Sequence, residues 1–154
     1  MNTDLVERLK EDFPYLFELG FELSAMDEDH RWSFVEFLSD DFRIEFEVLD
    51  GMLDVSIRHY YRREDKYGRW HGLSTYVELF ERHPVEFPTS VALASEEMKL
   101  LSHLLRQYMN KLQAFSREGS HAENESKLHQ IRKNISDRNW IKLARSNNRA
   151  EDTL

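Results

Sequence analysis

The chain has 154 residues, of which 40% are hydrophobic and 32% charged, and it contains no cysteine. Its length and its ten Phe, three Trp and six Tyr favour one folded domain over a disordered acidic segment. Because cysteine is absent, disulfides, thiolate zinc sites and Cys nucleophiles are excluded.

Charge is unevenly distributed along the chain. Residues 1–56 hold sixteen Asp/Glu against four Lys/Arg, whereas residues 57–154 hold thirteen against seventeen, within a net charge of -8. The N-terminus lacks the basic start and apolar run of a signal peptide, and no stretch reaches the roughly 18 apolar residues of a membrane span. We therefore expect a cytoplasmic protein that makes no membrane contact.

The first predicted element is an N-terminal helix. Leu5, Val6, Leu9 and Phe13 recur at helical spacing, which places them on one face. Pro14 ends this helix or opens a new turn. Gly20 is placed as a left-handed C-terminal cap before the chain becomes extended.

Four strand-like segments follow, in which apolar and polar residues alternate with a period of two. They cover residues 21–26, 32–38, 42–48 and 53–58, and Asp50-Gly51 is the dipeptide preferred by a type I′ hairpin turn. Short connections predict an antiparallel meander with one face against helices and one more polar face. A hairpin around Gly68 would add a fifth strand.

The C-terminal half is predicted to be helical. Thr75 and Glu78 have the spacing of a capping box and predict a short helix through Phe80. From Ser95 onward, a long helix carries an apolar stripe over residues 98–115. The stripe suits packing on the sheet, and a homodimer through this helix is the alternative.

Residues 119–126 are small and polar, so we interpret them as a hinge between a single α+β domain, residues 1–118, and a tail. The tail, residues 127–154, is predicted to be a basic helix that breaks or restarts near Ser136 and frays at its end.

The polar face of the predicted sheet is the principal candidate binding site. If the apolar alternates from Phe21 and Leu23 through Ile57 face the helices, the other face displays acidic side chains beside apolar anchors. Carboxylates of this kind attract a basic protein partner, and the anchors supply desolvated contact. The candidate residues are Glu22, Phe34, Glu36, Leu38, Glu45, Glu47 and Asp54.

A second candidate lies in residues 59–72, where basic and aromatic side chains alternate. Such a mixture can track phosphates and stack on bases, although the net charge of -8 makes nucleic acid the less favoured partner. Neutralisation of the acidic half within the fold is the structural alternative. The residues concerned are Tyr60, Tyr61, Arg62, Arg63, Lys66, Arg69 and Trp70.

Catalytic motifs are not found in the sequence. No HExxH, GxSxG, GxGxxG or GxxxxGK pattern occurs, so we expect no metal and no cofactor. Asp54, Glu64 and Lys66 weakly match the carboxylates and lysine of restriction-like nucleases. A metal-dependent nuclease is therefore kept only as an alternative to a non-enzymatic protein.

The first 83 residues or so resemble the small acidic bacterial immunity proteins that are encoded beside polymorphic toxins. The resemblance rests on Asp12-Phe13-Pro14-Tyr15-Leu16 with Gly20-Phe21, on the strand block through Ile57, and on Gly68-Arg69-Trp70. It implies an inhibitor that masks a basic toxin by surface complementarity. The alternative is a scaffold or regulatory subunit of a bacterial defence or phage-related assembly that docks through its C-terminal helices.

Overall fold

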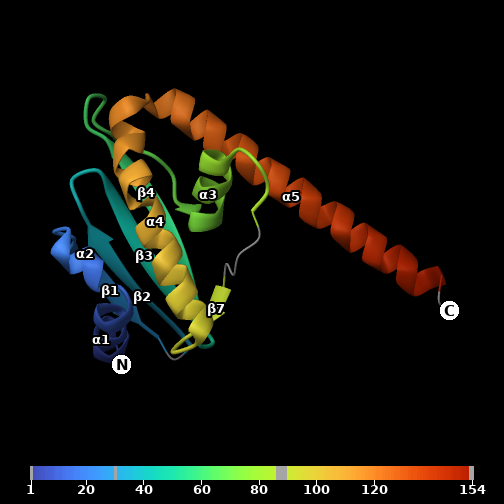
Figure 1. Ribbon diagram of the computed structural model, residues 1–154, viewed down its shortest axis with the longest axis horizontal. Coiled ribbons are helices and arrows are strands. Elements are labelled where there is room, and N and C mark those ends of the chain that lie inside the picture. Colours follow the sequence, from blue (N-terminus) through green and yellow to red (C-terminus); the bar gives the residue numbers. More distant parts are fainter. Residues whose placement is uncertain (1, 30, 86–89, 153–154) are drawn as a thin grey trace.

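An antiparallel sheet with helices packed on one face forms the body of the protein (Figure 1). The structure is a computed structural model that describes residues 2–29, 31–85 and 90–152. Its elements are α1 (Asn2–Asp12), α2 (Pro14–Glu18), β1 (Glu22–Glu28), β2 (Trp32–Leu38), β3 (Phe42–Leu49), β4 (Met52–Tyr61), β5 (Lys66–Tyr67), β6 (His71–Gly72), α3 (Leu73–Glu81), β7 (Ser90–Ala92), α4 (Glu96–Glu118) and α5 (His121–Asp152). The α+β class, the N-terminal helix and the helical C-terminal half are confirmed.

The predicted meander is present as β1 to β4, each strand antiparallel to the next. Asp50 and Gly51 have φ angles of 51° and 80°, as a type I′ turn requires. The fifth strand exists but covers only β5, and its turn precedes Gly68. Two further short strands, β6 and β7, pair with β4; they were not predicted because two or three residues carry no periodicity.

The chain turns sharply between the N-terminal helices and the sheet. Pro14 is the first residue of α2, where its missing N–H costs nothing. Gly20 has a φ of 85°, and Phe21 N–H donates to Leu16 O across it at 3.0 Å. This Schellman-type end directs the chain from α2 into β1.

One face of the sheet builds the core. The alternate residues of β2 to β4 that point to this face are buried against α1, α3 and α4. They are Val35, Phe37, Phe42, Ile44, Phe46, Val48, Leu53, Val55 and Ile57. Leu23 was predicted to join them, but it lies on edge strand β1 beside a β-bulge and is 46% exposed.

Helix α4 crosses the sheet as predicted. Ser95 caps it, its Oγ accepting from Met98 N–H at 3.2 Å. The apolar stripe from Met98 to Leu112 is buried in the core of the same chain. The predicted homodimer through this helix stays a prediction. The predicted capping box is wrong, because α3 begins at Leu73 and Thr75 lies inside its first turn.

A tight corner joins α4 to α5. Residues 119–126, interpreted as a hinge, contain Gly119 and the first turns of α5. Asn124 Nδ2 donates to Phe115 O at 2.8 Å, and Leu128 is fully buried. His71 Nε2 lies 2.9 Å from Glu125 Oε2. These contacts attach the start of α5 to the body, while hinge motion itself stays a prediction.

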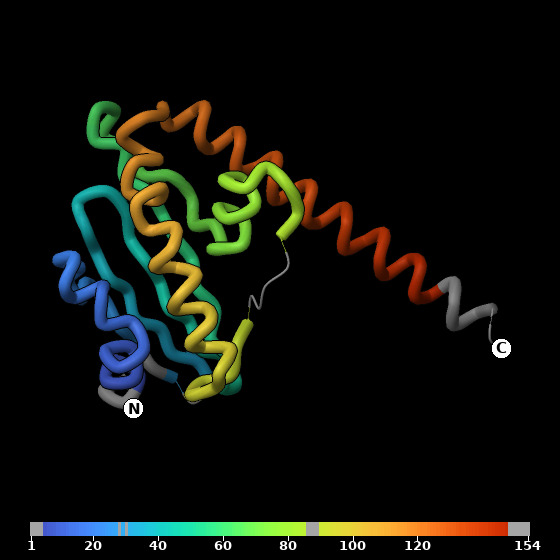
Figure 2. The backbone as a smooth tube through the Cα atoms, in the orientation of Figure 1, coloured from blue at the N-terminus to red at the C-terminus, as the bar shows by residue number. Residues whose placement is uncertain are grey.

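Helix α5 runs unbroken through Ser136, so the predicted break there is wrong. Its later turns extend away from the body (Figure 2). Among the described residues, no helix combines the length and apolar character needed to cross a membrane.

Candidate functional site

The strand register places all seven predicted face residues on one side of the sheet. Glu22 pairs with Leu38, Glu36 with Glu45, Phe34 with Glu47, and Glu47 with Asp54. Because alternate residues of a strand share a face, these side chains lie opposite the core. We call this side of the sheet the open face.

Two carboxylate pairs face each other across neighbouring strands of the open face. Glu36 on β2 lies directly opposite Glu45 on β3, and Glu47 lies directly opposite Asp54 on β4. Such cross-strand neighbours have Cβ atoms about 4.5–5.5 Å apart, and like charges placed there destabilise a sheet. We call these four residues the acidic patch.

The ionisation of the acidic patch reflects this crowding. Partial burial, followed by the charges of Glu47 and Glu36, raises the pKa of Glu45. Partial burial and the charge of Glu47 likewise raise the pKa of Asp54. The part of each shift that comes from neighbouring carboxylates would be offset by an added positive charge.

One arginine partly neutralises the patch. Arg43 Nη1 donates to Glu36 Oε1 at 3.0 Å, which accounts for one of the four carboxylates. Within the described ranges, Glu45, Glu47 and Asp54 have no cation within ion-pair distance. The patch therefore carries uncompensated negative charge.

Apolar side chains lie at one end of the open face. The rings of Trp32 and Phe34 contact each other with centroids 5.2 Å apart, and the register places Leu49 and Met52 beside Trp32. Leu49 and Met52 are exposed. Sequence reasoning placed Phe34 on this face but missed Trp32, Leu49 and Met52, although the same alternation along the strands places these three residues on the open face as well.

The other end of the open face is cationic. The guanidinium groups of Arg43 and Arg58 lie 5.0 and 4.8 Å from the ring centroid of Tyr67, and the Tyr60 ring lies 4.8 Å from it. Arg58 Nε also donates to Gly68 O at 2.8 Å. The open face thus changes from acidic to basic along the strands. Alternation places Arg43 and Arg58 on this face, but their meeting at Tyr67 depends on the short β5 pairing, which has no local signal.

Residues 59–72 do not form one continuous basic and aromatic surface. Tyr60 lies on the open face, whereas Tyr61 is buried on the helix side. Arg62, Arg63, Lys66 and Arg69 are exposed, and Trp70 is half-buried. Arg62 Nη2 lies 3.8 Å from Asp40 Oδ2, and both side chains are exposed; neutralisation of the acidic half by these arginines stays a prediction.

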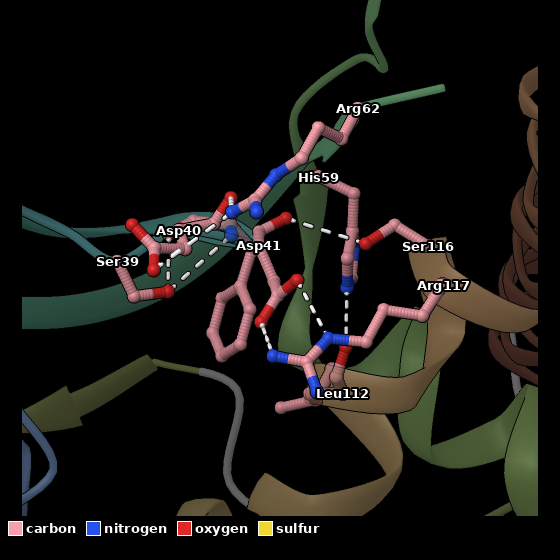
Figure 3. A network of polar contacts seen from close by, with 9 residues as sticks. Ser39, Asp40, Asp41, His59, Arg62, Leu112, Ser116 and Arg117 are labelled. Atoms are coloured by element: carbon pink, nitrogen blue, oxygen red, sulfur yellow. Dashed lines mark hydrogen bonds and ion pairs between the residues drawn. The ribbon is translucent and has the colours of Figure 1, made fainter. Parts of the chain in front are cut away.

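A polar network, buried at Asp41 and His59 and exposed at Arg117, fixes the loop between β2 and β3 to the end of α4 (Figure 3). Asp41 accepts two hydrogen bonds from Arg117, at 2.9 and 2.6 Å. His59 Nε2–H donates to Leu112 O at 2.7 Å, and Nδ1 accepts from Tyr76 O–H at 3.1 Å. Burial lowers the pKa of His59 to about 4, so this histidine is neutral and structural.

The residues of the nuclease alternative are not brought together. Asp54 lies near the start of β4, whereas Glu64 lies in the turn beyond its end and accepts from His121 N–H at 2.7 Å. The intervening strand spans roughly 23 Å at 3.3 Å per residue. In the part of the chain that the structure describes, no three His or carboxylate side chains gather as metal ligands would.

Comparisons with protein-family models, with curated proteins and with solved structures find no match for this chain.

Proposed function

We propose that this protein is a non-enzymatic binding protein of the immunity or antitoxin type, which masks a basic protein partner with its open face. The observation that carries the proposal is the opposition of Glu47 to Asp54 beside Glu45, because Glu36 is buried and already paired with Arg43. The isolated fold gains nothing from like charges in these positions. A partner that supplies Lys or Arg side chains would convert the repulsion into attraction.

The neighbouring side chains suit such a contact. Trp32 and Phe34 offer aromatic anchors beside the acidic patch, and aromatic residues are the side chains on which interfaces most depend. A cavity of about 280 Å³ borders Glu47 and Asp54. It offers room for a cationic side chain between these two carboxylates and the start of α3.

The change of sign along the open face would add specificity. Arg43 and Arg58 at the cationic end would repel the basic surface that the acidic patch attracts. A partner is then held in one orientation, with its own acidic or aromatic groups over Tyr67. The nucleic-acid alternative has weaker support, because Tyr61 is buried and cannot stack on a base.

The test uses the full chain as bait in extracts of its native cells at low salt, with wild type beside Glu45→Lys/Glu47→Lys. We expect a basic partner with the wild type and its loss with the variant. With the purified partner, the association rate should fall about tenfold or more in the variant, and its salt dependence should weaken.

Glu97→Lys/Glu118→Lys is the matched control, because both residues are exposed on α4 and the change in net charge is the same. The control should keep the partner. Glu45→Lys/Glu47→Lys should melt at or above the wild type, because lysines opposite Glu36 and Asp54 replace repulsion with attraction. Equal recovery of the partner by wild type and by Glu45→Lys/Glu47→Lys would contradict the proposal.

A further inference from the structure

An open groove of about 390 Å³ lies between the start of α3 and the side of α5 that faces it. Figure 1 shows the two helices next to each other, and the ion pair between Glu78 of α3 and Arg138 of α5 joins them. The volume of the groove falls in the range of small-molecule sites, about 300–1,000 Å³. The side chains of interest in its lining are Ser74, Thr75, Arg132, Asn139, Trp140 and Leu143.

The start of α3, at one end of this groove, has no side-chain cap. Gly72 occupies the N-cap position, and the first turn contains no acidic residue. The N–H groups of a first turn have no partner within their own helix, and the helix dipole places partial positive charge there. Phosphate groups commonly bind at helix starts for these two reasons.

The side chain of Thr75 lines the groove and is independent evidence for a ligand. Thr75 is only 5% exposed, and among the described residues its hydroxyl has no hydrogen-bond partner. A buried hydroxyl without a partner costs free energy. An oxygen atom of a ligand in the groove would accept from this hydroxyl and remove the cost.

The charge of the groove favours an anion. Arg132 lines it, and within the described ranges this arginine has no ion-pair partner. The described side chains of the lining include no carboxylate. Glu47 and Asp54 border a different cavity, which shares Ser74 with the groove. A phosphate between the start of α3 and Arg132 would therefore meet positive charge from both helices.

The other part of the groove suits a planar ring. Trp140 is 68% exposed and Leu143 is 51% exposed, although both line the groove. Bases and similar rings stack on exposed aromatic side chains of this kind. Asn139 is in the same lining, and its amide can both donate to and accept from the edge of a ring.

We propose that this groove binds a small molecule in which a phosphate monoester is joined to a planar ring, the chemistry of a mononucleotide. The phosphate lies between the start of α3 and Arg132, and the ring lies against Trp140. A nucleic-acid strand fits less well, because the net charge of -8 repels a polyanion. The proposed function uses the open face of the sheet, so the two proposals can fail separately.

The test follows NMR signals of the full-length chain at pH 7 and low salt, with adenosine monophosphate, inorganic phosphate and adenosine as probes. Adenosine monophosphate should shift the backbone amides of Ser74 and Thr75 and the indole N–H of Trp140, and the shifts should saturate. Inorganic phosphate should shift the two amides alone, and adenosine the indole alone. Each should bind about tenfold more weakly or less, because it makes one of the two contacts.

Single variants separate the two contacts. Arg132→Gln should weaken adenosine monophosphate and inorganic phosphate about tenfold each. Arg145→Gln is the matched control, because Arg145 is exposed on α5 outside the groove lining and the lost charge is the same; it should leave both affinities unchanged. Trp140→Ala should weaken adenosine monophosphate about tenfold and leave inorganic phosphate unchanged.

Three results would overturn the proposal. One is the absence of saturable shifts at Ser74 and Thr75 with adenosine monophosphate. Another is equal weakening by Arg132→Gln and Arg145→Gln, because the ligand would then respond only to the overall charge of α5. The third is adenosine, or an oligonucleotide, binding as tightly as adenosine monophosphate or more tightly, since neither result requires a phosphate monoester site.

Discussion

At the residue scale, the like charges of the acidic patch lower the stability of the isolated fold, although the same charges favour binding of a cationic partner. Partial burial raises the pKa of both Asp54 and Glu45, and the charge of Glu47, which lies opposite Asp54, adds to both shifts. An acid whose pKa is raised by folding stabilises the fold while it is protonated, and this stabilisation is lost as the pH rises through the folded-state pKa. At neutral pH the patch is therefore a cost to the fold.

Glu47→Gln should for this reason stabilise the isolated protein at pH 7 by about 0.2–1 kcal/mol, the range for opposed like charges. The pKa values of Glu45 and Asp54 should fall towards their ordinary values. Urea unfolding and an NMR titration measure the two effects, with Glu97→Gln as the control for an exposed glutamate outside the patch. If the pKa values of Glu45 and Asp54 are the same in Glu47→Gln as in the wild type, Glu47 does not repel these two carboxylates.

His59 provides a second prediction at this scale. Its folded-state pKa of about 4 lies below the ordinary value of 6.5, so the unfolded chain binds a proton more readily. Stability is then lost as the pH falls from 6.5 towards 4, by about 3 kcal/mol from this group. His59→Gln keeps a donor for Leu112 O but cannot titrate.

The free energy of unfolding of wild type and His59→Gln should be measured in urea between pH 4 and pH 8. The variant should be less stable at pH 7, by roughly 1–2 kcal/mol. Its disadvantage should shrink or reverse towards pH 4, because only the wild type loses the contribution of His59. A constant difference across this range would show that the histidine titrates normally.

At the element scale, α5 is attached to the body over a few turns. Leu128 is fully buried in the core cluster, whereas Asn124 and Glu125 hold the corner by hydrogen bonds. Leu128→Ala should cost roughly 2–4 kcal/mol and should release α5 before the rest of the chain. Leu100→Ala, at an exposed position of α4, is the control and should cost much less.

Hydrogen exchange followed by mass spectrometry checks this prediction. Amides of α5 should exchange faster in Leu128→Ala, while those of β3 and β4 keep their protection under native conditions. Equal acceleration in the sheet and in α5 would mean that the helix and the body unfold together.

The elements that sequence reasoning found are those with strong local signals. Strict alternation over β3 and β4, the Asp50-Gly51 turn and the α4 stripe each fixed an element without any long-range information. The continuity of α5 through Ser136 was missed because polar residues give no helical period. Its start is held by Asn124, Leu128 and the His71–Glu125 pair, which are contacts across the fold.

At the scale of the whole molecule, the charge asymmetry along the sequence becomes a separation in space. The acidic patch lies on the open face, whereas seven Lys/Arg belong to α5, whose later turns extend from the body (Figure 1). Alternation alone predicted which side of the sheet carries the candidate residues. It did not predict the cationic end of that face, because Tyr67 reaches Arg43 and Arg58 only through the short β5 pairing.

The β-bulge in β1 has a consequence for the behaviour of this protein at high concentration. In the described part of the chain β1 pairs with β2 alone, and its register shifts between Leu23 and Ala25. A regular outer edge is a template on which further strands can grow into fibrils, and a bulge with flanking acids such as Glu22 and Asp27 interrupts that template. This edge therefore disfavours irreversible cross-β growth between crowded copies.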